Sequence, residues 1–371
     1  MAKSQSGLQQ AIGQLLIIGF DGTTMSANLR SMLTRIQPAG VILFARNIAS
    51  AEQTHELLRD CQSCVSTVLF TCVDMEGGTV DRFRKVIGPS PSAAEVFATG
   101  DRKLFRKHGA MIGKACGMMG LNTDLAPVVD LALEDSRTVM TSRAVSADPR
   151  KATLYAREFL AGLRSSRVIG SLKHFPGLGG ANLDTHKELP NVARTWKQLW
   201  SQDLAPYRAL RREAPMVLIS HAAYPSVTRD RTPASLSRKW ITQVLRQKIQ
   251  YRGLVISDDL EMGGVLKAAS VEQAAVEHIR AGGDIGLVCH AEDHVIRSYE
   301  ALIKESERDN KFATRCQESI ARVLVLKRKL RRTSAAPDPT AVQRLSRDLW
   351  EFSEHIRLKN LQRQLPAQET A

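Results

Sequence analysis

Eight short apolar runs, each too short for a helix, are the feature that most constrains the fold of this 371-residue chain. Polar residues directly follow five of the runs, and longer stretches with helical periodicity, such as 152–165 and 270–281, lie between the runs. Runs of mainly apolar residues indicate strands buried on both faces, as in a parallel sheet. The runs cover residues 15–20, 40–44, 68–73, 123–127, 169–172, 216–220, 254–257 and 285–288.

Eight strands that alternate with helices predict an α/β protein with a TIM-type (β/α)8 barrel. Such barrels take about 250 residues and exceed 400 with insertions, so one domain can account for most of the chain. Residues 334–340 (SAAPDPT) have the composition of a linker, and residues 341–361 have the pattern of a charged helix. We therefore expect a catalytic domain over residues 1–335 and a linker with a helical C-terminal extension over residues 336–371.

The composition narrows the choice of partners. Lys and Arg number 52 against 38 Asp and Glu, a formal net charge of +14. This excess would suit an anionic partner, but it is also typical of a solvated basic surface. The sequence has no aromatic RNA-binding signature and no zinc-finger spacing, so we expect no nucleic acid partner and no metal.

The cysteines and the first twenty residues bear on the compartment. The six cysteines contain a single C-x-x-C pair, Cys61 and Cys64, a pattern that favours reduced thiols over disulfides. The first apolar stretch is short and is not followed by a small-residue cleavage pattern. We expect no signal peptide, no membrane partner and a cytoplasmic protein, acting as a monomer or a weak homodimer.

Polar side chains follow several of the expected strands, at the carboxyl end of each. In barrel enzymes the active site lies at this end of the strands. The residues in question are Asp74 after the third run, Lys173 and His174 after the fifth, His221 after the sixth, and Asp258 with Asp259 after the seventh. If the strands are assigned correctly, these side chains converge on one pocket.

Asp258 has more than one interpretation on the sequence alone. A carboxylate delivered rigidly by a strand can attack an anomeric carbon, or it can hold a metal or another cation. An aspartate at a strand-to-helix turn can equally cap the helix by accepting backbone N–H groups, and Asp259 fits that role as well.

The segment KHFPGLGGANLDTHKELP at 173–190 carries an aspartate two residues before a histidine. Asp184 could fix the tautomer of His186 and leave its other ring nitrogen free to move a proton. The alternative without a catalytic role is an Asx-turn beside an exposed histidine. Glycines at 177, 179 and 180 would let the loop swing over the barrel mouth like a lid.

Lys173 and His174 have three interpretations. A lysine at a barrel strand end can form a Schiff base with a carbonyl substrate, as in an aldolase. It can instead donate hydrogen bonds to substrate hydroxyls. The structural alternative is a lysine whose ammonium reaches solvent beside a satisfied core histidine.

Taken together in chain order, these segments resemble the bacterial β-N-acetylglucosaminidases of glycoside hydrolase family 3 over most of residues 10–330. The matching segments are GVILFARN at 40–47, VDMEGGTVDRF at 73–83, LAPVVDL at 125–131, SRAVSADP at 142–149, the KHFPG and DTH segment, and ISDDLEM at 256–262.

The resemblance implies a role for each matching residue. Asp258 would be the catalytic nucleophile, His186 the general acid/base and Asp184 its dyad partner. The resemblance places five residues around the hydroxyls of the terminal N-acetylglucosamine: Asp74, Arg82, Arg143, Lys173 and His174. It implies a small-molecule glycoside or muropeptide substrate and neither a metal nor an organic cofactor.

One departure from the family pattern stands at Leu178, where the family often has a second histidine in KHFPGHG. The dyad residues are unaffected, so we still expect hydrolysis of terminal β-linked N-acetylglucosamine with retention of configuration. Two alternatives remain open: phosphorolysis by the same residues, and a catalytically silent barrel that binds wall fragments or nucleic acid.

Overall fold

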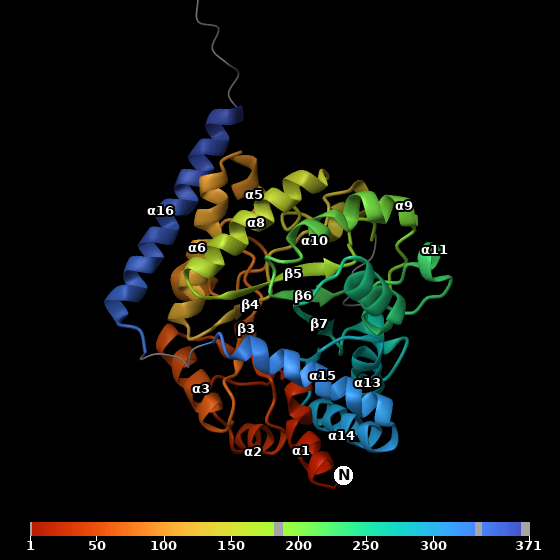
Figure 1. Cartoon of the computed structure of the whole chain (residues 1–371). Coiled ribbons are helices and arrows are strands. Elements are labelled where there is room, and N and C mark those ends of the chain that lie inside the picture. Colours follow the sequence, from red (N-terminus) through yellow and green to blue (C-terminus); the bar gives the residue numbers. More distant parts are fainter. Residues whose placement is uncertain (1, 182–187, 331–335, 365–371) are drawn as a thin grey trace, which may run out of the picture.

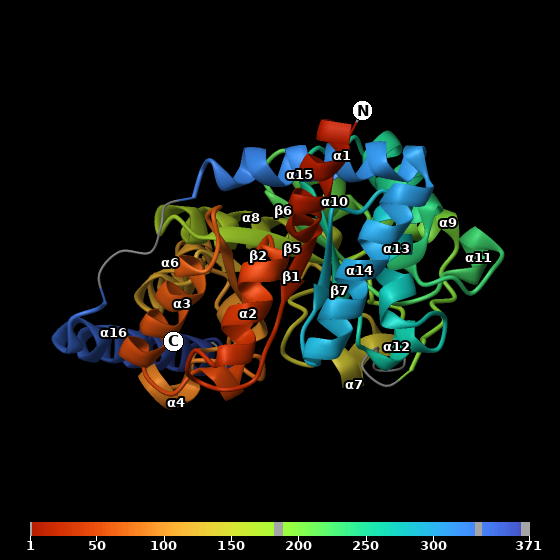
Figure 2. The same ribbon diagram turned by 90° about the horizontal axis from the view of Figure 1, so that it is seen from below.

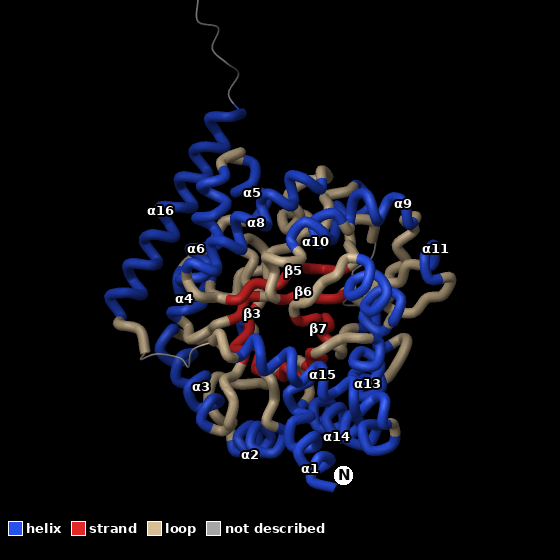
Figure 3. The backbone as a smooth tube through the Cα atoms, viewed as in Figure 1, coloured by secondary structure: helices blue, strands red, loops and turns tan. Residues whose placement is uncertain are grey.

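The computed structural model describes residues 2–181, 188–330 and 336–364. A closed ring of eight parallel strands forms its centre, with helices outside the ring, and β1 pairs with both β2 and β8 (Figures 1 and 3). The predicted TIM-type barrel is therefore confirmed. The strands are β1 (Leu16–Ile18), β2 (Gly40–Leu43), β3 (Phe70–Val73), β4 (Thr123–Asp124), β5 (Ile169–Phe175), β6 (Met216–Ile219), β7 (Leu254–Asp259) and β8 (Ile285–Val288).

Each apolar run contains one strand, but β5 and β7 continue beyond their runs into charged residues. β5 includes Lys173 and His174, and β7 includes Asp258. The strand register shifts between Leu172 and Phe175 and between Ile256 and Asp259. Such irregularities re-aim side chains at barrel rims, and they occur here where Lys173, His174 and Asp258 reach the mouth.

The helices follow the expected alternation with the strands. The longer ones are α1 (Ala2–Ala11), α2 (Ala27–Ile36), α3 (Ala51–Ser63), α6 (Arg102–Met118), α8 (Pro149–Ser165), α13 (Val271–Ala281), α14 (Glu292–Arg308), α15 (Asn310–Lys327), α16 (Pro339–Gln364) and the π-type helix Lys239–Lys248. The shorter ones are α4 (Arg84–Ile87), α5 (Ala93–Ala98), α7 (Arg137–Met140), α9 (Trp196–Gln198), α10 (Ala205–Leu210), α11 (Pro225–Thr228), α12 (Gly263–Leu266), a π-type turn at Leu199–Asp203, and 3-10 turns at Ile12–Leu15, Ala45–Asn47, Glu134–Ser136 and Ala234–Leu236.

Helix α15 lies across the amino-terminal end of the barrel, opposite α7 and α12 (Figure 2). Val323 of α15 belongs to the apolar cluster of the barrel interior, and Leu326 packs against that cluster. The ammonium of Lys327 is also buried there and donates to Oε1 of Gln14 at 2.6 Å and to Oγ1 of Thr67 at 3.0 Å. Neither partner is charged, so α15 closes this end with a buried amino group that has no ion pair in the described part of the chain.

Helix α16 coincides with the helix expected over residues 341–361 and packs on α4, α5 and α6. Its buried residues are Leu345, Leu349, Phe352 and Ile356. The side chain of Ser346 donates to the carbonyl of Ile87 at 2.9 Å. The predicted division of the chain at residue 335 stays a prediction. In the described residues, no helix is both long enough and apolar enough to cross a membrane.

Replacing Lys327 with methionine tests this buried amino group. Burial lowers the pKa of Lys327 to about 7, against an ordinary value of about 10.4. Between these values the unfolded chain binds a proton that the folded chain lacks, so this residue makes stability rise with pH. We subtract the unfolding free energy of Lys327→Met from that of the wild type. We expect this difference to rise by up to about 1.4 kcal/mol per pH unit between pH 7 and 9.

Urea denaturation at several pH values measures that difference. Comparison with the variant is needed because burial raises the pKa of thiols such as Cys72, which acts in the opposite direction. The control is Lys304→Met on the exposed face of α14, where no pH-dependent difference is expected. A difference that stays constant with pH for Lys327→Met would contradict the lowered pKa.

Candidate active site

The polar residues predicted from the strand ends lie at the end of the barrel away from α15. α12 directly follows β7, and Figure 2 shows α12 at that end. The centre of the site is Glu76, a buried residue just after β3. Its carboxylate accepts two hydrogen bonds from Arg143, both at 2.8 Å, and one contact of 2.6 Å from the ammonium of Lys173. Asp74 accepts from the same ammonium at 2.7 Å.

The charges in this cluster stabilise one another. Burial pushes the pKa of Glu76 upward, but Arg143 and Lys173 outweigh it and hold that pKa below its usual range. Burial likewise pushes the pKa of Asp74 upward, and Lys173 with Arg82 reverses the shift. Both carboxylates are therefore ionised at neutral pH.

Lys173 is charged for the same reason. Burial lowers its pKa, but Asp74 and Glu76 outweigh burial and raise the pKa above its ordinary value. A Schiff base forms from a neutral amine, so these carboxylates oppose the aldolase interpretation. The side chain is only 3% exposed, so its ammonium does not reach solvent either. Of the three interpretations of Lys173, hydrogen bonding to a ligand fits best.

His174 is held from one side by Asp130. Oδ2 of Asp130 accepts from Nδ1 of His174 at 2.6 Å and from its backbone N–H at 3.1 Å. The other ring nitrogen lies 3.4 Å from Nη2 of Arg143. A proton on Nδ1 leaves Nε2 as an acceptor, which suits its contact with the guanidinium.

Asp258 is the second-last residue of β7 and is half-buried. Its Oδ1 accepts the backbone N–H of Asp259 at 3.0 Å. It does not cap α12, because that helix begins at Gly263 after Met262. Burial raises the pKa of the Cys289 thiol, and the carboxylates of Asp259, Asp74, Glu261 and Asp258 raise it further.

Asp259 has a structural role instead. Its Oδ1 accepts the N–H of Glu261 at 3.1 Å, and its Oδ2 lies 3.1 Å from Nε2 of His290. Its backbone carbonyl accepts from Nε2 of His221 at 2.8 Å. Burial lowers the pKa of His221, so this residue supports the end of β7 as a neutral ring.

Aromatic and cationic side chains form the rim next to β2 and β8. The Phe44 ring stacks on His290 at 5.7 Å between centroids, and Arg46 lies 4.6 Å over the Phe44 ring. Arg82 is 5.8 Å from the same ring, and its buried Nε has no hydrogen-bond partner in the described residues. Arg82 thus has a donor available for a ligand at the mouth.

The glycines before the DTH segment are closely packed. A Cβ at Gly179 would come within 2.7 Å of the carbonyl oxygen of Leu131, and Gly177, at φ +127°, accepts from the hydroxyl of Tyr224 at 2.8 Å. Leu178 is buried, and its N–H donates to Asp130 at 2.7 Å. These contacts hold residues 177–179 closely packed, and the expected swing of the loop over the mouth stays a prediction. Asp184 and His186 lie outside the described residues.

All five predicted sugar-binding residues lie in or beside this cluster, but the sequence did not single out Glu76, Asp130 or Asp124. Burial raises the pKa of Asp124 well above its usual range, while its Oδ1 accepts the N–H of Met75 at 3.0 Å. Glu76 and Asp130 were visible as acidic residues in VDMEGG and LAPVVDL. In the described residues, no group of three His, Cys, Asp or Glu could hold a metal ion.

The sequence of this chain is similar to a known protein family and to known proteins. The sequence profile of the Glycosyl hydrolase family 3 N terminal domain matches residues 7–326. The Beta-hexosaminidase of Idiomarina loihiensis is 32% identical over 299 residues, which is 80% of this chain and 89% of that protein. The Beta-hexosaminidase of Xanthomonas campestris pv. campestris is 35% identical over 285 residues, 75% of this chain and 85% of that protein.

Solved structures of two related enzymes are similar to this chain. A glycoside hydrolase family 3 beta-N-acetylglucosaminidase from Paenibacillus sp. has a TM-score of 0.85 and 29% identity, covering 93% of this chain and 68% of that one. A Beta-N-acetylhexosaminidase from Beutenbergia cavernae has a TM-score of 0.79 and 26% identity, covering 86% of this chain and 98% of that one.

Replacing Glu76 with glutamine tests whether its charge holds the cluster together. Two buried cations would then share a neutral partner, and we expect the free energy of unfolding at pH 7 to fall by about 3 kcal/mol. Because the folded pKa of Glu76 is depressed, its contribution is present above the ordinary carboxyl pKa of about 4.3 and is lost below it. The deficit of the variant should therefore shrink as the pH drops below about 4.3.

Urea denaturation across pH 3.5–7 provides the measurement. The matched control is Glu213→Gln, which removes the more exposed ion pair with Arg157 and should cost less than about 1 kcal/mol. Equal losses in the two variants would show that the Glu76 charge has no special weight.

Proposed function

This chain belongs to glycosyl hydrolase family 3, and we propose that it removes terminal, non-reducing β-linked N-acetylglucosamine with retention of configuration. The enzyme class expected from the motifs, a family 3 glycoside hydrolase of the β-hexosaminidase type, is confirmed by the matches to the family and to curated relatives. The observation that carries the proposal is the half-buried Asp258 carboxylate at the end of β7, on the same barrel mouth as a buried cluster of donors and acceptors.

The cluster suits the hydroxyl groups of a sugar. Asp74 offers acceptor oxygens, and Lys173, Arg143 and Arg82 offer donors, so a hydroxyl can donate and accept at once. The ion pairs around Glu76 fix these groups before the substrate arrives. Preorganised charges of this kind lose little energy to rearrangement during the reaction. We assign the terminal sugar to Asp74, Arg82, Arg143, Lys173 and His174.

The proposed first step forms a covalent intermediate. An oxygen of Asp258 attacks C1, the glycosidic C–O bond breaks, and the leaving oxygen takes a proton from His186. In the second step, water attacks C1 and gives a proton to His186, the bond to Asp258 breaks, and the sugar leaves with its original configuration. Asp184 would orient the imidazole and stabilise its protonated form, and help of this kind is worth about 10²–10⁴-fold.

We further propose muropeptide fragments as the natural substrate and the cytoplasm as the compartment. The family resemblance in the motifs supports the substrate. The free state of all six cysteines supports a reducing compartment. No metal or organic cofactor enters the proposed steps.

Asp258→Asn should reduce hydrolysis of an aryl N-acetylglucosaminide by at least about 10³-fold, because an amide oxygen is a poor nucleophile. The control Asp348→Asn changes an exposed carboxylate on α16 and should leave the rate unchanged. Mass spectrometry after incubation with a 5-fluoro glycosyl fluoride should find the sugar ester on Asp258 of the wild type. A trapped ester on another residue would refute the assignment. Sugar 1-phosphate as the product with phosphate present would identify a phosphorylase instead.

His186→Ala should affect substrates according to their leaving groups. An alkyl N-acetylglucosaminide needs a proton on its leaving oxygen, so its turnover should drop by about 10²–10⁴-fold. A 2,4-dinitrophenyl glycoside needs little such help, so the rate of its glycosylation step should change much less. His355→Ala on α16 is the control. Equal losses on the two substrates would count against the acid/base role.

A further inference from the structure

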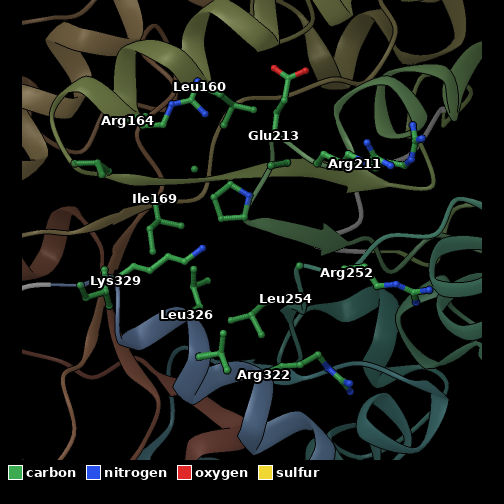
Figure 4. A pocket seen from close by; sticks show the side chains of 18 of the residues that line it. Leu160, Arg164, Ile169, Arg211, Glu213, Arg252, Leu254, Arg322, Leu326 and Lys329 are labelled. Atoms are coloured by element: carbon green, nitrogen blue, oxygen red, sulfur yellow. The ribbon is translucent and has the colours of Figure 1, made fainter.

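A second cavity lies at the opposite end of the barrel from Asp258. Its volume is about 1330 Å³, and its wall includes the start of β5 at Ile169, the start of β7 at Leu254 and one face of α15. Figure 4 shows Lys329 reaching from the turn after α15 toward the middle of the cavity, with Leu326 and Ile169 beside it. A cavity of this size can hold a drug-sized or nucleotide-sized ligand, for which about 300–1,000 Å³ is typical.

The wall is strongly basic. Seven of its residues are Arg or Lys, and two are Glu. In the described parts of the chain, five of these cations have no side-chain hydrogen bond or ion pair: Arg164, Arg167, Arg212, Arg252 and Lys329. They come from α8, from the segments before β5, β6 and β7, and from the turn after α15, so the barrel places cations from distant parts of the sequence around one cavity.

The two glutamates do not neutralise these five cations. Glu213 pairs with Arg157 at 3.1 Å, and Glu318 pairs with Arg315 at 2.6 Å. Neither arginine belongs to the unpaired set. The cavity therefore has an excess positive charge that no acidic side chain in the described residues balances. Like charges gathered in one hollow repel each other, and a bound anion would remove that repulsion.

Two residues in the cavity wall have left-handed backbone conformations. Arg167 has a φ of +61° and Gln250 a φ of +63°, and both line the cavity. Side-chain-bearing residues avoid this region, which favours glycine. Arginine at position 167 thus adds positive charge to the cavity where glycine would fit the backbone better. Arg167 follows the C-cap of α8 and Gln250 follows that of the π-type helix, and left-handed residues commonly end helices in this way.

We propose that this cavity binds a small polyphosphate-bearing ligand, such as a nucleoside triphosphate. Four of the five unpaired cations are arginines, whose forked guanidinium groups match phosphate oxygens two at a time. A triphosphate carries about four negative charges, close to the five unpaired positive ones. The apolar part of the wall, which includes Leu254, Val325 and Leu326, would accommodate the organic portion of the ligand.

Isothermal titration of the whole chain with inorganic tripolyphosphate tests the phosphate part of the site. We expect one equivalent to bind, with affinity that falls as salt is added. The double variant Arg164→Gln/Arg252→Gln should weaken binding by about 10-fold or more. The control Lys304→Gln/Arg347→Gln removes two exposed cations from α14 and α16 and should stay within about twofold of the wild type. Equal losses in both variants, or no binding by the wild type at 1 mM, would overturn the proposal.

A glycine variant separates binding from folding. Arg167→Gly removes a charge and also relieves the backbone, so it should weaken tripolyphosphate binding while raising the unfolding midpoint without ligand by about 1–2 °C. Gln250→Gly relieves a similar backbone without removing a charge, so it should leave binding unchanged. Unaltered binding in Arg167→Gly would overturn the proposal. A 20-nucleotide single strand that binds through the same arginines more tightly than tripolyphosphate or ATP would overturn it in favour of a nucleic acid partner.

Discussion

The ion pairs that Glu76 makes with Lys173 and Arg143 join three separate segments beneath the barrel mouth. Each member would be costly to bury alone, because a charge without a partner loses its hydration. Together the members keep one another ionised, and they fix the end of β5 relative to the segments that follow β3 and α7. Asp74 and His174 are attached to this cluster and take their positions from it. The arrangement of the mouth thus depends on charges that balance inside the protein.

The two ends of the barrel differ in how their charged side chains are paired. At the carboxyl end, buried acids and bases are matched in close pairs, so this cluster is held in place by its own ion pairs. At the amino end, Lys327 is buried against neutral partners, and within the described residues the side chains of four arginines around the neighbouring cavity have no hydrogen bond or ion pair. A parallel barrel separates these ends by the length of its strands, so one chain can combine a preorganised site with a surface whose charge remains unbalanced.

The barrel could be predicted from sequence because burial on both faces leaves a run of apolar residues at each strand. The candidate site was partly predictable, since Asp258 and Lys173 stand at the ends of such runs. Glu76 and Asp130 were harder to recognise, because their importance comes from partners 67 and 44 residues away in the sequence. The basic cavity could not be found this way at all. Its cations are spread from residue 164 to residue 329 within a chain that is basic throughout, and only the closed barrel brings them together.

Leu178 replaces a histidine of the family motif, but its backbone still contacts the site through Asp130. Where the family pattern often has a histidine, this chain has a buried leucine whose backbone N–H donates to Asp130. Asp130 also holds His174, so the backbone at position 178 helps to orient a predicted sugar-binding residue. That contact uses the main chain and is independent of the side chain at 178. The substitution can therefore change the surroundings of the loop while leaving the support of His174 intact.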